Sequence, residues 1–558
     1  MNFENIKNKL ISENLDAYLI GYGNRFIGQD VLPEEHKLQY VCGFSGSAGM
    51  LAVTPKHAYL FVDGRYELQA RQEVDLSKIT VINKAPCLKN VCAFLKEFGC
   101  GLVGYDGMSV SALELKNVRD LGLKLKDVGD WVNINSLTKI NLEKRSLEYA
   151  GLASSDKMQP LKRLLTQNSA DYYLLTAVDS VSWLLNIYAK DLPCSPVVRA
   201  YAVIGKNGLV TLVGDNLQTE LPVLSFVDFE KWLAENSSKK FIYDQSSTSV
   251  RLQNLLKNSM EAMDVCQVLK AEKNETELAG MIACHKRDGV ALIQLLYWLD
   301  NNWKGKTELD VVEKLHEFRQ QQNLFFSESF ETIAGTAENG AIVHYQPTIK
   351  TNKILQENSL LLLDSGGQYL DGTTDVTRTI ALGQPTSEMI HDFTLVLKGH
   401  IALSQAVFPE GTCGLCLDAL ARRPLWREGK DFKHGTGHGV GCFGNVHEGP
   451  NRISSNGSLY GFKKNMITSI EPGYYKENAY GIRIENLVYS KVSAEHENYL
   501  EFEPLTLVPI DKRLIDVYLL DSGERDWLNN YHRKVYESLA ACVNDNVKKW
   551  LKASCSPL

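Results

Sequence analysis

The chain of 558 residues is too long for a single hydrophobic core, so we expect two to four domains. Its content of 44% hydrophobic and 23% charged residues is typical of a globular protein in water. The formal net charge of −7, without a basic stripe along the sequence, argues against a nucleic-acid partner.

The sequence contains no stretch typical of targeting or of membrane insertion. Its first residues lack a basic segment followed by an apolar one, and no apolar run reaches about 18 residues. We therefore expect a cytoplasmic protein without a membrane partner. The 12 scattered cysteines fit reduced thiols in that compartment.

The one Cys-x-x-Cys spacing joins Cys413 and Cys416, and it lacks the second pair that a zinc ribbon requires. A redox pair is the alternative, but nothing nearby in the sequence would lower a thiol pKa. We expect two small core residues on a helix from Cys413 to Arg422.

An amphipathic helix followed by a strand occurs twice. The first copy covers residues 1–20, and the second covers residues 161–175, with Asp171 in the place of Asp16. A pair of apolar strands follows each copy. This repetition predicts two copies of one α/β unit, and a chance likeness of two helix–strand segments is the alternative.

The second copy fades near residue 260, and a different pattern of long helices follows. One helix is predicted to start at the N-cap Asn274 and to run through Trp298, and another starts at Thr307. We place the start of a large C-terminal domain near residue 266. Its last part is predicted to be helical and to dock through four aromatic residues: Trp527, Tyr531, Tyr536 and Trp550.

Two aspartates bracket a predicted hairpin in this domain. The apolar run that ends in Asp364 predicts a buried strand, and Asp375 lies in a β-branched run after a turn that contains Asp371. In such a hairpin Asp364 and Asp375 would face each other. Because buried carboxylates require a positive partner, the candidates are Arg378 and a metal ion, whereas Asp371 belongs to the turn.

Two histidines lie in the glycine-rich run from His434 to Gly441. Its four glycines disfavour a helix, and on an extended chain His434 and His438 share one face. A lone histidine is more often structural. Two of them in such a run, with His447 soon after, favour a functional site.

Two glutamates and a further histidine lie in strand-like segments. Glu471 is held extended by Pro472, and the plain alternative is an acid at the end of a strand. Alternation places Arg483 and Glu485 on one strand face, where the alternative is a solvated ion pair. His344 adjoins a β-branched pair.

Together these segments supply four carboxylates and one imidazole. Such a hard, oxygen-rich set suits Mn²⁺, Co²⁺ or Fe²⁺ better than a structural zinc site. The number of ligands suits two ions, which at about 3.5–4 Å apart can hold a hydroxide and clamp both groups of a hydrolysis. The predicted ligands are Asp364, Asp375, His438, Glu471 and Glu485.

These residues and their flanking motifs resemble the metal signature of the pita-bread metallopeptidases. The runs at 371–379, 445–450 and 502–510 narrow the resemblance to the long, three-domain form of the aminopeptidase P family. The resemblance covers nearly the whole chain and implies an α/β (α+β) fold. Two creatinase-N-like α/β domains, residues 1–132 and 133–265, would precede a pita-bread catalytic domain with a C-terminal extension, residues 266–558.

The resemblance also implies an activity, which is metal-dependent release of the residue that precedes proline at the N-terminus of a peptide substrate. It implies two divalent ions, first of all Mn²⁺, with Co²⁺, Fe²⁺ or Zn²⁺ as alternatives, and a homodimer. Asp364 and Asp375 would bind one ion, with Asp375 bridging. His438 and Glu471 would bind the other, and Glu485 would bridge.

Further roles follow from the same resemblance. Glu471 would take the proton of a water that bridges the ions. His344 and His447 would contact the substrate carbonyl or its oxyanion, and His434 would lie on the substrate side. Arg483 would orient a carboxylate ligand.

Two other functions stay open from the sequence. A prolidase shares the ligands but normally has one N-terminal domain, so the repeat favours aminopeptidase P. A catalytically silent binding protein on this fold would have lost ligands, and none is missing from the sequence.

Overall fold

The computed structural model describes residues 3–28, 31–134 and 139–558, so residues 1–2 of the first predicted helix lie outside it. The chain divides into two compact units. Unit 1 comprises Met1–Arg145, Leu152–Leu192 and Pro196–Cys266, and unit 2 comprises Ser146–Gly151, Pro193–Ser195 and Gln267–Leu558. The predicted limit between residues 132 and 133 lies inside unit 1 and stays a prediction.

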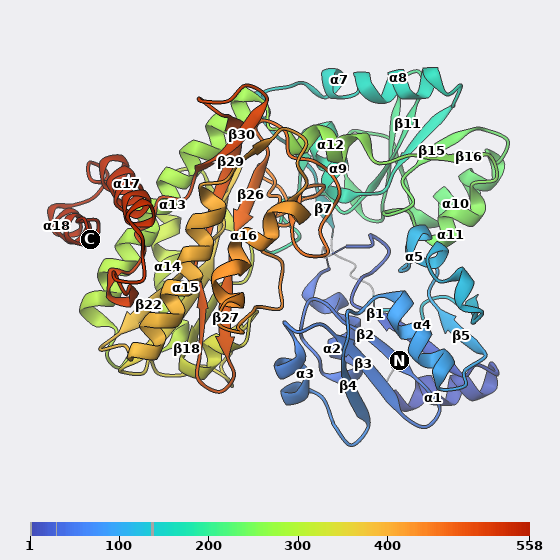
Figure 1. Cartoon of the computed structure of the whole chain (residues 1–558). Helices are drawn as coiled ribbons and strands as arrows, with labels where there is room; N and C mark the ends of the chain where they lie inside the picture. The colour runs from blue at the N-terminus through green and yellow to red at the C-terminus, as the bar shows by residue number, and fades with distance from the viewer. Residues whose placement is uncertain (1–2, 29–30, 135–138) are drawn as a thin grey trace. The chain divides into compact units, whose positions relative to one another are not determined.

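Unit 1 contains two six-stranded sheets with the same order and directions of strands (Figure 1). The first sheet has the order β4 (Ile79–Asn83), β3 (Ala58–Val62), β2 (Met50–Val53), β1 (Ala17–Gly21), β5 (Leu102–Tyr105), β6 (Lys124–Asp127). The second has the order β14 (Val223–Leu224), β12 (Val210–Val213), β11 (Tyr201–Gly205), β9 (Tyr172–Leu175), β15 (Phe241–Tyr243), β16 (Ser259–Glu261). In both, the fourth strand is antiparallel to the third and parallel to the fifth. The predicted repeat is therefore confirmed.

Each of these sheets is covered by helices on both faces, which explains why its strands are apolar on both sides. In the first sheet, alternate residues of β1 pack with α1 (Phe3–Ser12) and with α4 (Leu88–Glu97). In the second, alternate residues of β9 pack with α8 (Gln159–Gln167) and with α10 (Phe226–Glu235).

The repeated aspartates have matching structural roles. The Asp16 carboxylate accepts hydrogen bonds from the backbone N–H groups of Gly101 and Leu102, at 2.7 and 2.8 Å. The Asp171 carboxylate accepts one from Lys240, at 3.1 Å. Each aspartate thus ties the start of a central strand to the neighbouring parallel strand.

Unit 2 is built around two antiparallel sheets. One has the order β18 (Ile333–Thr336), β19 (Ser359–Ser365), β22 (Val376–Leu382), and the other β23 (Val407–Pro409), β30 (Tyr499–Pro504), β29 (Asn486–Val492), β26 (Ile467–Ile470). A further sheet joins β17 (Phe325–Glu328), β20 (Gly367–Tyr369) and β21 (Gly372–Thr373). Two short ladders pair β24 (Gly437–His438) with β25 (Arg452–Ile453) and β27 (Gly473–Lys476) with β28 (Tyr480–Arg483).

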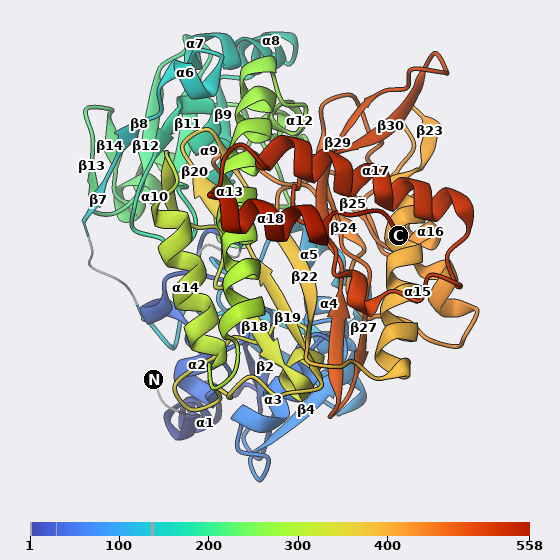
Figure 2. The same ribbon diagram turned by 90° about the vertical axis from the view of Figure 1, so that its left-hand side faces the viewer.

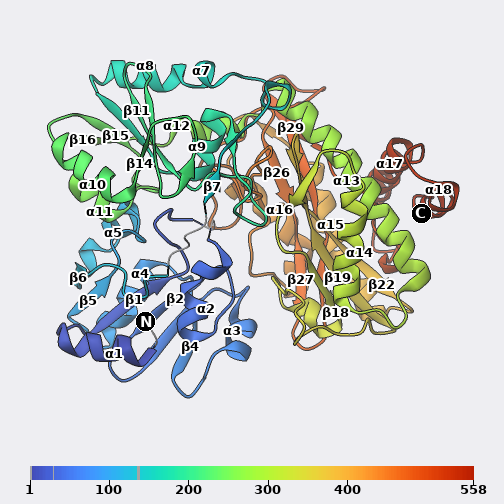
Figure 3. The ribbon, with the colours of Figure 1, turned by 180° about the vertical axis from the view of Figure 1, so that it is seen from behind.

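Long helices cover these sheets. Figures 2 and 3 show α13 (Glu275–Asn302) and α14 (Glu308–Gln320) beside β18, β19 and β22, with which they share a hydrophobic core. Both predicted starts are confirmed, because Asn274 and Thr307 form capping boxes. On the chain that the structure describes, no helix combines the length and the hydropathy of a membrane span.

The remaining helices of unit 2 are α15 (Ser387–Ser404), α16 (Gly414–Trp426), α17 (Ser522–Leu539) and α18 (Asp545–Ser554). The last two contact α13, and α18 (red) crosses it in Figure 2. The four aromatic residues predicted to dock this end all pack in or against one core cluster, so that prediction is confirmed. The prediction for the cysteine pair is wrong, because Cys413 caps α16 half-buried and Cys416 is exposed.

Three histidines of unit 2, His285, His400 and His532, lie in the protein interior. The His400 Nδ1–H donates to the carbonyl of Ile470 at 3.1 Å, and His532 Nε2 accepts from the N–H of Ile510 at 3.0 Å. Burial lowers the pKa of His285 to about 4 and the pKa values of His400 and His532 to about 3. All three side chains are therefore neutral near pH 7.

His532 is expected to destabilise the folded chain as the pH falls. In the unfolded chain a histidine binds a proton below its ordinary pKa of about 6.5, whereas buried His532 stays neutral, so acid favours unfolding. Between pH 7 and pH 5 this costs about 2 kcal/mol. Thermal unfolding in EDTA measures it, and His532→Gln is expected to lose less stability over that interval than the unaltered chain. Exposed His496→Gln is the matched control, and equal losses in all three proteins would contradict the assignment.

Candidate metal centre

Asp364 and Asp375 come from the antiparallel pair β19–β22. The strand register places Asp364 opposite Thr377, and Asp375 lies in the link between β21 and β22. The expectation that the two aspartates face each other directly across a hairpin is therefore wrong. Their side chains are nevertheless close enough for the charge of Asp364 to contribute to the raised pKa of Asp375.

The other three predicted ligands also lie at strand ends or between strands. The predicted extended run around His438 is a strand of only two residues, β24. Glu471 lies between β26 and β27, and Glu485 lies between β28 and β29. Arg483 and Glu485 are thus not on one strand as predicted, and both are buried rather than solvated.

These side chains converge on one point. The Nε2 atom of His438 is 3.5 Å from Asp375 Oδ2 and 3.5 Å from Glu471 Oε1. Asp375, His438 and Glu485 each offer one ligand atom within 4.8 Å of the others. Asp364 and Glu471 are close enough for their charges to act on Glu485. The structure therefore brings all five predicted ligands together.

The cluster holds more negative charge than its protein surroundings balance. Burial, and then the charges of neighbouring carboxylates, raise the pKa values of Asp375 and Glu485 well above their ordinary range. The guanidinium that opposes this is Arg483, whose Nη2 donates to Asp364 Oδ2 at 2.6 Å. Arg378, which the sequence offered as another partner for the aspartates, donates instead to the carbonyls of Glu485, Val508 and Pro509.

The side chains fit divalent ions. His438 donates its Nδ1–H to the carbonyl of Gly439 at 3.0 Å, and burial lowers its pKa to about 4. Its Nε2 therefore presents a lone pair to two carboxylates, an arrangement that a cation between them would stabilise. Among the described residues, the buried Oδ1 atom of Asp364 has no hydrogen-bond partner. The Nε2 atom of His438 and the Oδ1 atom of Asp364 are therefore available as metal ligands.

Arg483 connects several of the ligands. Its Nε donates to Thr377 Oγ1 at 3.1 Å, and Thr377 Oγ1 in turn donates to Glu485 Oε2 at 2.8 Å. With the bond to Asp364, one buried guanidinium thus fixes the carboxylate of Asp364 on β19 directly, and that of Glu485, between β28 and β29, through Thr377. Partners of this kind orient metal ligands.

Tyr475 was not predicted, and it extends the same network toward His434. It accepts from Arg483 Nη1 at 2.5 Å and donates to His434 Nε2 at 2.8 Å. His434 Nδ1 lies 4.0 Å from Glu471 Oε2, so His434 adjoins the cluster. The doubled tyrosine directly after the Glu471 motif was the sequence signal available for this residue.

The other two predicted histidines have different settings. The ring of exposed His447 lies 4.3 Å from the ring of His438, centroid to centroid, which places it at the cluster. His344 is half-buried in the turn after the 3₁₀ helix η3 (Ala337–Ala341), and that helix contacts β28 and β19. The roles of both histidines stay predictions.

A buried ion pair supports the hairpin that carries the aspartates. Arg319 Nε donates to Asp288 Oδ1 at 2.8 Å, and Arg319 Nη2 donates to Ser365 Oγ at 3.1 Å. Thr374 Oγ1 donates to Asp288 Oδ2 at 2.9 Å. Because Ser365 and Thr374 each adjoin a predicted ligand, this pair fixes the spacing of Asp364 and Asp375. Local sequence patterns gave no sign of it.

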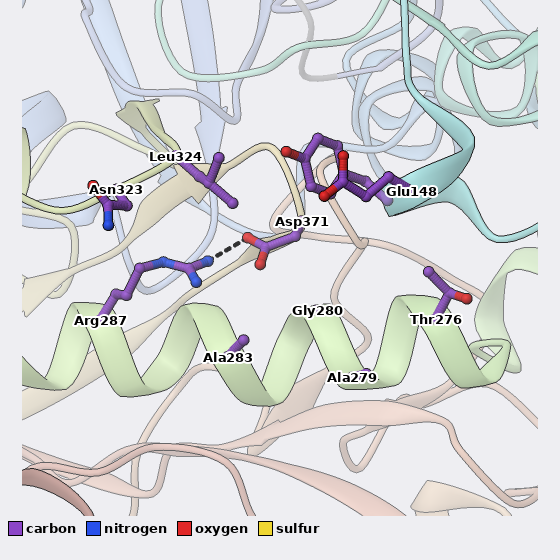
Figure 4. A pocket seen from close by; sticks show the side chains of 10 residues that line it. Glu148, Thr276, Ala279, Gly280, Ala283, Arg287, Asn323, Leu324 and Asp371 are labelled. Carbon is purple, nitrogen blue, oxygen red and sulfur yellow. Dashed lines mark hydrogen bonds and ion pairs between the residues drawn. The ribbon is translucent and has the colours of Figure 1, made fainter.

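A separate cavity of about 660 Å³ lies along α13, and none of the five predicted ligands lines it. Figure 4 shows Asp371 and Arg287 on its wall, joined as an ion pair, above Gly280 and Ala283 of the helix. Asp371 therefore binds an arginine of α13, which agrees with its exclusion from the metal ligands.

Comparisons with known proteins point to the same chemistry. Residues 279–491 match "Metallopeptidase family M24" and residues 498–558 match "C-terminal region of peptidase_M24". Residues 3–136 and 136–277 each match a "Creatinase/Prolidase N-terminal domain". A "Probable Xaa-Pro aminopeptidase P" from Laccaria bicolor is 36% identical over 93% of this chain and 87% of its own length. "Aminopeptidase P2" from Arabidopsis thaliana is 35% identical over 99% of this chain and 87% of its own.

Solved structures agree. The structure of X-prolyl aminopeptidase from Caenorhabditis elegans, described as a cytosolic enzyme with a dinuclear active site, superposes with a TM-score of 0.91. It is 31% identical and covers 98% of this chain and 95% of its own. A prolidase from Pyrococcus furiosus, 23% identical with a TM-score of 0.50, covers 62% of this chain and 98% of its own, and it shares the fold.

The fold and the carboxylate–imidazole cluster define a metallopeptidase. The chain belongs to metallopeptidase family M24, among the relatives named Xaa-Pro aminopeptidase P. The predicted fold class, with two creatinase-like domains before a pita-bread catalytic domain, and the predicted resemblance to aminopeptidase P are confirmed.

Proposed function

We propose that this chain releases the N-terminal residue from peptides whose second residue is proline. The observation that carries the proposal is the placement of His438 Nε2 between Asp375 and Glu471, in a cluster that holds the complete predicted ligand set. The substrate class is supported by relatives that span nearly the whole chain and are named for Xaa-Pro cleavage.

The proposed ligand assignment follows the family resemblance and is supported by the convergence of the five side chains. Asp364 and Asp375 would hold one ion, His438 and Glu471 would hold the other, and Asp375 and Glu485 would serve both. The relative from C. elegans is described as dinuclear, which supports two ions, and the oxygen-rich ligand set favours Mn²⁺ among divalent metals. When bound, the ions supply Lewis-acid polarisation of the scissile carbonyl and acidify the attacking water.

The protein's own groups supply proton transfer and orientation. Glu471 is the proposed proton acceptor, because its side chain is 18% exposed whereas that of Asp375 is 6% exposed. An acceptor must be reached by water, and Glu471 is the more accessible of the two carboxylates that face His438. His447 and His344 are proposed to donate to the carbonyl oxygen as charge develops there, and His434 borders the substrate near Glu471.

The substrate preference has a chemical reason. An Xaa-Pro bond lacks the N–H that general peptidases bind, so a dedicated enzyme must recognise the bond by other contacts. The carboxylate-rich cluster with its ions is proposed to bind the free N-terminal amine, which would place the first peptide bond at the ions. Such recognition would require a free N-terminus and would set no limit on the residues after proline.

Arg-Pro-Pro is expected to be a better substrate than Arg-Pro. In the presence of Mn²⁺ the purified chain should release arginine from the tripeptide with the higher kcat/KM, and EDTA should stop the reaction. Arg-Ala-Ala serves as the control without proline and is expected to stay intact. Amino-acid analysis of the products measures all three reactions.

The outcomes separate the candidate functions. Hydrolysis restricted to the dipeptide Arg-Pro would assign the chain as a prolidase. No hydrolysis by protein that has bound Mn²⁺ would instead indicate a silent binding protein. Cleavage of Arg-Ala-Ala at a comparable rate would remove the requirement for proline.

The cellular setting belongs to the same proposal. We place the protein in the cytoplasm, as the C. elegans enzyme is described as cytosolic. The homodimer is inferred from the family resemblance, and analytical ultracentrifugation of the purified chain tests it.

A further inference from the structure

Two thiols lie side by side at the start of α16, outside the metal centre. The sulfur atoms of Cys413 and Cys416 are 3.7 Å apart. Cys413 is the N-cap of this 13-residue helix and is half-buried, whereas Cys416 is exposed. A disulfide requires about 2.05 Å between sulfurs, so a modest rotation of one exposed side chain would close the gap.

The backbone that carries the thiols is held in place. The amide of Cys416 donates to the carbonyl of Cys413 at 3.0 Å, and Cys413 forms an antiparallel bridge with Gly461. Further along α16, Asp418 accepts from Arg422 at 2.7 Å, and both side chains are buried. Because the helix is anchored, the two thiols keep their proximity, and the second step of an exchange reaction becomes intramolecular.

The proximity of the two thiols also affects the ionisation of the second one. A hydrogen bond from Cys416 to the Cys413 sulfur, and then the charge of that sulfur, raise the pKa of Cys416. Because the pKa of Cys416 is raised, Cys413 is taken as the first nucleophile and Cys416 as the reserve thiol.

We propose that Cys413 and Cys416 form a redox-active dithiol that closes to a disulfide by exchange with a small-molecule disulfide. The Cys413 thiolate attacks one sulfur of the oxidant, forming a mixed disulfide and expelling one thiolate. Cys416, after losing its proton to solvent, attacks the Cys413 sulfur and expels the second. Two protein thiols are oxidised, and the oxidant is reduced to two thiols.

A metal ion fits this pair less well than a disulfide. A thiolate metal site in a protein takes four ligands in its structural form. The described residues bring no third cysteine, histidine, aspartate or glutamate into ligand distance of these two sulfurs. Two ligands alone would leave most of the coordination sphere to water.

Oxidation of the Mn²⁺-loaded full chain by glutathione disulfide tests the proposal. Mass spectrometry of the peptide that contains both cysteines is expected to show the loss of two hydrogens, and dithiothreitol should restore them. Two free thiols after treatment, or a glutathione adduct retained on this peptide, would overturn the proposal. This measurement requires no variant, so it does not depend on how a substitution folds.

Variants test the order of attack. Cys416→Ser removes the reserve thiol, so glutathione is expected to remain attached to Cys413; a variant without that adduct would contradict Cys413 as the nucleophile. Cys542 is also exposed but is remote in sequence from the pair, which makes Cys542→Ser the matched control. This control is expected to lose the same two hydrogens from the Cys413–Cys416 peptide as the unaltered chain.

Discussion

Replacing Asp375 with asparagine is expected to lower Mn²⁺-dependent kcat/KM for Arg-Pro-Pro by about 1,000-fold or more. Asp375 lies 3.5 Å from His438 Nε2 and shares the cluster with Glu485, so a neutral amide there removes a ligand proposed to reach both ions. Initial-rate kinetics at saturating Mn²⁺ measure the loss.

A second measurement separates the loss of metal from a failure to fold. An ion that binds only the folded chain raises its stability by about 2.7 kcal/mol at 100 times Kd, so Mn²⁺ should raise the unfolding temperature of the unaltered chain. Asp375→Asn is expected to lose most of that gain. Without metal it should unfold near the temperature of the unaltered chain, because burial and neighbouring carboxylates raise the pKa of Asp375 and so favour a neutral side chain there.

Asp371→Asn is the matched control for this experiment. It makes the same chemical change on the same hairpin, but at a side chain that pairs with Arg287 on α13. It is expected to keep its activity and its stabilisation by Mn²⁺, even if its unfolding temperature falls. Near-normal activity of Asp375→Asn with both ions bound would contradict the ligand assignment.

Glu471→Gln is expected to lower kcat by about 10²–10⁴-fold, the contribution typical of a positioned proton acceptor. Glutamine keeps a carbonyl oxygen near His438 Nε2, to which Glu471 Oε1 lies at 3.5 Å, but it cannot take a proton from water. The variant is assayed together with its metal content by atomic emission spectroscopy.

Glu477→Gln removes the same charge from the exposed turn that follows β27, and it is expected to leave kcat unchanged. The proton-transfer role of Glu471 would be refuted by a near-normal kcat for Glu471→Gln with metal bound. Loss of metal together with loss of rate would instead show that Glu471 acts mainly as a ligand.

The features that were predicted correctly from the sequence depend on residues close to one another in the chain. The caps at Asn274 and Thr307 are formed by side chains that bond backbone groups within one helical turn. A helix, a strand and then a pair of apolar strands recur in both halves of unit 1, so two copies of one unit could be inferred. The ligand types were also recognisable, because each lies in a short motif with glycine, proline or threonine around it.

The features that could not be predicted from the sequence depend on irregular backbone and on contacts between residues far apart in the chain. Alternation along a continuous strand placed Arg483 and Glu485 on one face, but β28 ends at Arg483 and β29 begins at Asn486. The bonds from Arg483 to Asp364 and from Arg319 to Asp288 join segments far apart in the chain. No local pattern encodes such pairs, and none indicated that Cys416 is exposed.

The distribution of ligands along the chain has a consequence for biosynthesis. The predicted ligands extend from Asp364 to Glu485, and the hairpin of the first two is tied by Arg378 to Tyr531 of α17 at 2.8 Å. A ribosome-bound chain that has not yet released α17 therefore lacks part of the support of its own metal site. We therefore expect full support of the site only once α17 has packed against the catalytic domain.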